Sequence, residues 1–180
     1  LINGSGWVNI ALPIGISFFT FQSLSYNIDV YRGDEEPLKN PMHYLIYIFS
    51  FPQMIAGPIV RFGAVARELK QRPFSRENVV LGTQRFIVGL AKKVLIANAV
   101  AEAFPMEGVT EWTSAGAWLA LLSYAVQIYF DFSGYSDMAI GLGRIMGFQF
   151  PENFNRPYNA TSFTDFWRRW HMTLSFWMRD

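Results

Sequence analysis

A histidine in a segment rich in tryptophan and arginine is the first feature of this sequence that could do chemistry. The segment runs from Arg156 to Asp180, and His171 follows directly after Trp167-Arg168-Arg169-Trp170. An imidazole accepts and returns a proton near neutral pH, which suits it to general acid–base catalysis. A histidine on an apolar helix face is also a common structural residue, and the sequence leaves both interpretations open.

The spacing of apolar residues around this histidine predicts one continuous helix over residues 163–178. Ser162 followed by Asp165 resembles a capping box and places the helix start near Phe163. Large apolar side chains then recur every three or four residues, and His171 falls within their stripe while Arg168 and Arg169 point elsewhere. In a membrane setting, an ionisable residue at such a position favours a functional role.

A second polar cluster lies at the end of an apolar run, between Gln127 and Asp137. It contains the acids Asp131 and Asp137 together with the hydroxyl-bearing Ser133, Tyr135 and Ser136. Two carboxylates six residues apart lie about 120° from each other on a helix, which is a poor geometry for a catalytic pair. The cluster therefore predicts either polar contacts between helices, through small residues such as Gly134, or the lining of a pocket.

Composition excludes several classes of protein. The chain has 180 residues, of which 51% are hydrophobic and only 16% are charged, with a net charge of +1 and no cysteine. The low charge argues against nucleic-acid binding, which requires an excess of Lys and Arg. The absence of cysteine excludes disulfides and a thiol nucleophile, and no His/acid cluster indicates a metal site.

Long stretches without charge predict an all-α, polytopic helical membrane protein. Uncharged runs cover residues 1–28, 40–60 and 112–130, and a bilayer span needs roughly 20 apolar residues. We expect spans near residues 7–28, 41–60, 78–103 and 113–148. The third carries Arg85, Lys92 and Lys93, which could extend to the interface from a tilted span capped by Ser75. An amphipathic helix on the membrane surface is the alternative.

The loops between these runs differ in charge. Basic residues dominate residues 61–77, whereas acids dominate residues 29–39 and 102–111. By the positive-inside rule, the loop at 61–77 should be cytoplasmic and the other two should lie across the membrane. The sequence also begins inside an apolar segment without a methionine, so we expect it to be part of a longer protein.

Four stretches of the sequence resemble the membrane-bound O-acyltransferase (MBOAT) family. They cover residues 12–22, 51–61, 129–137 and 151–158, and the last runs on into residues 165–175. The similarity is to the bacterial branch that O-acetylates alginate and D-alanylates teichoic acid, and it is stronger toward the alginate type. The resemblance implies that residues 1–180 are part of an MBOAT-type transmembrane helical bundle in the bacterial inner membrane.

The resemblance also implies a reaction. An acetyl group would pass from a cytoplasmic thioester, acetyl-CoA or a related donor, to an exopolysaccharide such as alginate, with no bound cofactor. Implied partners are the lipid bilayer and periplasmic polysaccharide O-acetylation proteins, with no nucleic acid. His171 matches a family histidine, whereas the family's second histidine, in a Trp-His-Gly motif, has no counterpart here. We therefore expect this piece to be inactive alone.

The chemistry of acyl transfer and the positions of polar and aromatic residues suggest further candidates for the site. His171 would act as base or hydrogen-bonding partner, and Arg168 and Arg169 would hold donor phosphates or headgroups, with interfacial snorkelling as their alternative. The pocket candidates are Asp131, Ser133, Tyr135, Asp137, Asn155, Trp167 and Trp170.

Two other classes of protein fit part of the pattern. A polytopic transporter or flippase for a glycan or lipid intermediate would also use Gly- and Pro-interrupted helices and a buried histidine. Such transporters often carry inverted repeats, and residues 1–60 and 78–148 share no common pattern. A non-catalytic scaffold that recruits periplasmic acetylation proteins is the third possibility.

Overall fold

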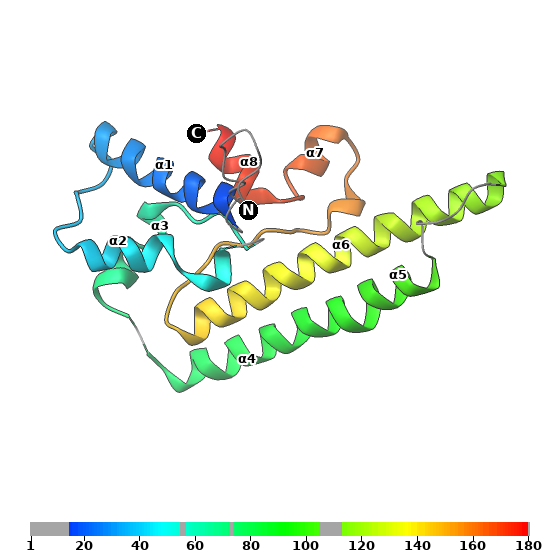
Figure 1. Ribbon diagram of the computed structural model, residues 1–180, viewed down its shortest axis with the longest axis horizontal. Helices are drawn as coiled ribbons and strands as arrows, with labels where there is room; N and C mark the ends of the chain where they lie inside the picture. The colour runs from blue at the N-terminus through cyan, green and yellow to red at the C-terminus, as the bar shows by residue number, and fades with distance from the viewer. Residues whose placement is uncertain (1–14, 55–56, 73, 105–112, 180) are drawn as a thin grey trace, which may run out of the picture.

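The fold is built from helices and the loops that join them. The computed structural model describes residues 15–54, 57–72, 74–104 and 113–179, and these ranges contain no β-strand. The predicted all-α class is therefore confirmed for the described residues. Figure 1 shows two parts, a cluster of short helices near both ends of the chain and a pair of long antiparallel helices.

The long pair is the most regular part of the molecule. Its first member runs through α4 (Arg76–Ala91), a π-helical stretch (Lys92–Asn98) and α5 (Ala99–Ala103). Its second member is α6 (Ser114–Ile145), which returns along the first. The Ser75 hydroxyl accepts the Asn78 N–H at 3.1 Å, as expected for a helix cap. The two members lie close to the predicted intervals 78–103 and 113–148.

Glycines allow the two long helices to approach closely. A Cβ on Gly89 would lie 2.5 Å from the carbonyl oxygen of Gly134, and one on Gly82 would lie 2.6 Å from that of Gly141. Side chains at these positions would collide with backbone, so the interface requires glycine. The predicted role of Gly134 in a helix–helix contact is thereby confirmed.

The cluster of short helices contains the densest apolar core. It is formed by α1 (Ile16–Arg32), α2 (Pro41–Ile48), a 3₁₀ turn (Phe51–Gln53) and α3 (Phe62–Lys70). Its centre holds Tyr47, Val60, Phe62 and Val65, each at most 2% exposed. The Tyr47 hydroxyl donates to the carbonyl oxygen of Val60 at 2.8 Å, so the one polar atom of this ring is satisfied.

The boundaries of the first two predicted spans differ from the structure. Residues 41–60 do not form one helix, because α2 ends at Ile48 and the chain then enters the 3₁₀ turn that contains Pro52. Helix α1 continues beyond residue 28 to Arg32, where Gly33 adopts a φ of 78° and ends it. Residues 7–14, 55–56, 73 and 105–111 of the predicted spans and loops lie outside the described residues.

The C-terminal segment contains the clearest departure from prediction. Ser162 does cap a helix, since its hydroxyl accepts the Asp165 N–H at 3.1 Å. That helix, α7, covers only Phe163–Trp167, and a second, α8, covers Met172–Arg179. The predicted continuous helix over 163–178 is therefore wrong. The break falls at His171, which has a φ of 44°.

None of the helices in the described part of the chain is both long enough and apolar enough to cross a membrane.

Candidate functional site

The site centres on the turn between α7 and α8, which we call the histidine turn (residues 169–172). An extended segment after α6 pairs with it through two backbone hydrogen bonds. The Met172 N–H donates to the carbonyl oxygen of Asn153 at 2.9 Å, and the Asn155 N–H donates to that of Arg169 at 2.9 Å. These bonds replace helical ones, so the chain leaves the helix where the apolar spacing predicted continuity.

Around the imidazole, hydrogen bonds converge on one amide oxygen. Asn153 Oδ1 lies 2.9 Å from His171 Nδ1, 2.9 Å from Thr173 Oγ1 and 3.3 Å from the Thr173 amide nitrogen. Thr173 Oγ1 in turn accepts the N–H of Ile59 at 3.0 Å. The histidine is thus tied to a segment more than one hundred residues earlier in the chain.

The imidazole lies in an apolar environment. Its ring meets the edge of Phe132 on α6, with ring centroids 4.9 Å apart. The side chain is half-buried, and this burial lowers the pKa of His171 from its ordinary value to about 4. His171 is therefore uncharged near neutral pH and can accept a proton.

Aromatic side chains surround the histidine turn. Trp170 packs edge-on against Phe154 at 5.1 Å and stacks on Phe166 at 5.6 Å between ring centroids. Trp170 also lies 6.2 Å from Tyr129, which brings α6 into the same cluster. Trp167, by contrast, is 57% exposed and contacts only the rim of the cluster through Phe166. Of the two predicted tryptophans, the structure therefore places Trp170 beside His171 and Trp167 at the surface.

The two arginines of the motif differ in environment. Arg169 Nε donates to Asp165 Oδ1 at 2.9 Å, one helical turn earlier. This pairing and its hydrogen bonds lower the pKa of the Asp165 carboxyl. The side chain of Arg168 is exposed to solvent. Arg168 is therefore better placed than Arg169 to meet an anionic group from outside.

Acids and bases of the long helix pair form ion pairs across its interface. Asp137, which is 7% exposed, accepts from Arg85 Nε at 2.7 Å and from Lys92 Nζ at 2.6 Å. Lys93 pairs with Asp131. Arg85, Lys92 and Lys93 were predicted to extend to the membrane interface. In the structure, each of them pairs with a carboxylate instead. Asp131 and Asp137 serve separate pairs, in agreement with their predicted unsuitability as a catalytic pair.

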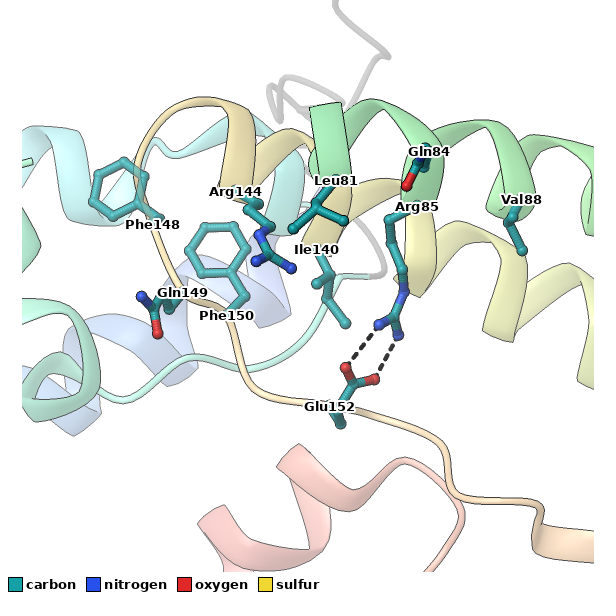
Figure 2. Close-up of a pocket in the computed structure, with 10 residues that line it drawn as sticks. All are labelled: Leu81, Gln84, Arg85, Val88, Ile140, Arg144, Phe148, Gln149, Phe150 and Glu152. Carbon is teal, nitrogen blue, oxygen red and sulfur yellow. Dashed lines mark hydrogen bonds and ion pairs between the residues drawn. The ribbon is translucent and has the colours of Figure 1, made fainter. Parts of the chain in front are cut away.

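A bidentate ion pair contributes to the lining of two cavities. Arg85 binds both carboxylate oxygens of Glu152, at 2.8 and 2.5 Å, as the dashed lines in Figure 2 show. The cavity in that view has a volume of about 500 Å³ and is lined partly by Phe148 and Phe150. A second cavity, of about 300 Å³, also includes both members of the ion pair in its lining.

The second cavity gathers some of the predicted pocket residues. Ser133 and Asp137 line it together with Asn153. Tyr135 is half-buried on α6, and Asn155 is exposed. The hydroxyls of Ser133 and Ser136 and the amide nitrogen of Asn153 are buried without a hydrogen-bonding partner among the described residues. The predicted set is therefore split between this cavity, the histidine turn and the surface.

Sequence reasoning missed the residues that hold His171 in place. Asn153 and Thr173 lie within the longer motifs of residues 151–158 and 165–175. Neither was picked out, because neither belongs to the apolar stripe of a helix or strand. Arg85 and Glu152 were missed as a pair, since 67 residues separate them. The charge of Arg85 inside an apolar interval was the one available signal that a carboxylate partner exists.

Comparisons with known proteins agree with one another. The sequence profile of the MBOAT, membrane-bound O-acyltransferase family matches residues 37–180. The chain is 49% identical over 173 residues to a probable alginate O-acetylase AlgI of Azotobacter vinelandii, covering 96% of this chain and 35% of that protein. It is 38% identical to a peptidoglycan O-acetyltransferase of Helicobacter pylori, with coverages of 96% and 38%.

A more distant relative belongs to the same group. The teichoic acid D-alanyltransferase of Bacillus subtilis is 34% identical over 180 residues, with 96% of this chain and 45% of that protein covered. The chain thus spans about a third of the length of its alginate O-acetylase relatives. The profile covers most of the chain, and its matched region contains the ion pairs, the second cavity and the histidine turn: the chain belongs to the membrane-bound O-acyltransferase family.

Proposed function

We propose that this chain is part of a membrane O-acetyltransferase that transfers an acetyl group from a cytoplasmic thioester to an exopolysaccharide such as alginate. The observation that carries the proposal is the imidazole of His171, held in a turn by a hydrogen-bond contact with the buried Asn153. Its family membership supplies acyl transfer, and the named activity of its alginate O-acetylase relatives supports the acceptor class.

The reaction requires a base at the acceptor hydroxyl. As the hydroxyl oxygen attacks the thioester carbonyl, His171 takes up the hydroxyl proton, and a carbon–oxygen bond forms. The carbon–sulfur bond then breaks, and the proton passes from the imidazolium to the departing thiolate. Donors aimed at the developing oxyanion would complete the site. The exposed guanidinium of Arg168 is suited to the phosphates of a donor such as acetyl-CoA.

We place this chemistry in the bacterial inner membrane, in a multi-pass protein. Long uncharged runs in the sequence support this location. Large apolar side chains on the outside of the long helix pair support it as well. Leu95 and Trp118 are 71% and 66% exposed, and lipid or further protein would cover such surfaces. Periplasmic O-acetylation proteins are the partners that this function would need.

Replacement of the histidine tests the proposal. In the native protein, His171→Gln and His171→Ala should lower the O-acetyl content of the polysaccharide by at least about 100-fold, since a general base contributes 10²–10⁴ in rate. The readouts are ester content of the polymer and acetyl-CoA consumption by isolated membranes. Asn159→Ala, at an exposed position of the same region, is the control. Full acetylation in His171→Ala, with normal protein levels in the membrane fraction, contradicts the proposal.

A further inference from the structure

Asn153 is more deeply buried than Thr173, the other polar residue of the hydrogen-bond network around His171. Its side chain and backbone are 1% exposed, and the residue contacts the turn in two ways. Its carbonyl oxygen accepts the Met172 N–H, and its side-chain oxygen accepts from Thr173 and faces the ring nitrogen of His171. A buried amide with this many contacts to one turn constrains the position of that turn.

The partners of Asn153 determine which of its side-chain atoms faces the histidine. The amide N–H of Thr173 can only donate, so the atom 3.3 Å away must accept and is the oxygen. The Thr173 hydroxyl already accepts the N–H of Ile59, and its single proton is therefore available to donate to the same oxygen at 2.9 Å. Both contacts fix an acceptor, Oδ1, in front of the imidazole.

The state of the imidazole follows from that acceptor. His171 Nδ1 lies 2.9 Å from Oδ1, a hydrogen-bond distance that requires a proton on Nδ1. In a neutral imidazole with its proton on Nδ1, the lone pair is on Nε2. A base whose tautomer is set by a hydrogen bond to its other nitrogen is a recurrent arrangement in catalysis by histidine.

We infer that Asn153 is a positioning residue for His171, which it holds in the tautomer protonated at Nδ1 so that Nε2 is the proton acceptor. The inference rests on the proposed role of His171 as base and adds the group that orients it. Thr173 and the Ile59 N–H fix the orientation of Asn153 in turn, which joins residues 59, 153, 171 and 173 into one network.

Charged and titratable groups on the surrounding elements do not replace Asn153 in this role. Those on neighbouring elements are Asp131, Asp137 and Tyr129 on α6, Glu152 beside Asn153, Arg61 before α3, and Asp165, Arg168 and Arg169 around α7. The four carboxylates are all ion-paired. Burial is the cause of the lowered pKa of His171, so a charge introduced at residue 153 would act on an otherwise apolar environment.

Asn153→Asp is the decisive variant, because it keeps an acceptor of the same size and adds a negative charge beside Nδ1. The charge favours the imidazolium, so the acid limb of the pH–rate profile should move upward by about 1–3 pH units. Acetyl transfer from acetyl-CoA is measured with membranes that contain the native protein. Asn159→Asp makes the same chemical change at an exposed asparagine and should leave the profile in place.

A spectroscopic measurement tests the tautomer without reference to activity. In the ¹⁵N-histidine-labelled native protein, the signals of His171, assigned by their loss in His171→Gln, should show a protonated Nδ1 and an unprotonated Nε2. Asn153→Ala removes the acceptor and should mix the two tautomers, with a loss of about 10–100-fold in transfer rate. This readout separates orientation of the ring from a general contribution to folding.

The possible outcomes distinguish the inference from the function on which it rests. An unmoved acid limb in Asn153→Asp, or a lone pair on Nδ1 in the unmodified protein, overturns the role of Asn153 and leaves His171 as base. Full activity in His171→Ala overturns the proposed function itself. Loss of folded protein in Asn153→Asp, without a shifted profile in the remainder, also counts against positioning and assigns Asn153 a structural role.

Discussion

The long helix pair and the histidine turn are held together by contacts of different kinds. In the helix pair, Gly82 meets Gly141 and Gly89 meets Gly134, so successive contacts are seven residues apart on both helices. Seven residues are two helical turns, and such an interface repeats along the sequence. In the histidine turn, the contacts join residues 18, 20 and 114 apart and repeat nowhere.

This comparison indicates which regions of the molecule can be changed independently. A periodic interface distributes its stability over many similar contacts. The exception in the helix pair is Asp137, whose ion pairs concentrate a large contribution at one residue. The histidine turn depends on a few hydrogen bonds that share atoms, so its members should behave as a unit. Changes in the helix pair should therefore act mainly on stability, whereas changes in the turn should act mainly on acetyl transfer.

The largest effect on stability is expected from Asp137→Asn. The substitution keeps the size of the side chain but leaves Lys92 without its carboxylate and Arg85 with Glu152 alone. Breaking a buried pair costs about 3–5 kcal/mol, and partial exposure of both cations places the effect near the lower limit. Thermal unfolding of the detergent-solubilised native protein measures it.

Asp165→Asn is the matched control for that change. It removes a carboxylate from a half-exposed pair that joins α7 to the histidine turn, and because ion pairs near the surface contribute little, it should leave the unfolding midpoint nearly unchanged. Equal unfolding midpoints for the two variants would show that the Asp137 ion pairs contribute no more to stability than the Asp165–Arg169 pair does.

A smaller loss is expected from Gly89→Ala. The new methyl group would lie within 3 Å of backbone atoms of Gly134 and Met138, so the two helices would have to separate. Overpacking of this kind costs about 1–3 kcal/mol. In the control, Gly63→Ala, the methyl group meets only the flexible carboxylate of Glu35. A stability of Gly89→Ala equal to that of the control would refute close glycine packing.

The smallest effect, with the opposite sign, is expected from Arg156→Gly. Arg156 has a φ of 45° in the extended segment that leads to the histidine turn, and glycine adopts this conformation without steric cost. We expect a gain of about 0.5–1 kcal/mol in unfolding free energy with unchanged acetyl transfer. Arg168→Gly, at an ordinary φ of −75°, should lose stability instead. A loss of stability in both variants would show that the backbone at Arg156 is not strained.

Sequence patterns predicted the regular region better than the irregular one. The helices at 76–103 and 114–145 lie within a few residues of the expected intervals, because caps and uncharged runs are local signals. The predicted helix over 163–178 fails because apolar spacing reports which residues share a face and not whether the backbone stays helical. There, backbone hydrogen bonds to residues 153 and 155 compete with helical ones and prevail.

The same contrast applies to the site. His171 could be picked out because an imidazole next to two tryptophans and two arginines is unusual in itself. Its supporting residues could not, because Asn153 and Thr173 acquire their roles only when distant segments meet. Ser133 and Asp137 were selected for polarity at the end of an apolar run, and both line the second cavity.

The hydrogen bond from Ile59 to Thr173 has a consequence for biosynthesis. Its two residues are 114 positions apart, and a ribosome that adds 5–20 residues per second needs about 6–23 s to make the intervening chain. During that interval the Ile59 N–H lacks the side-chain acceptor that it has in the folded structure. The hydrogen-bond network around His171 can thus form only after Thr173 has been made, well after the segment that contains Ile59.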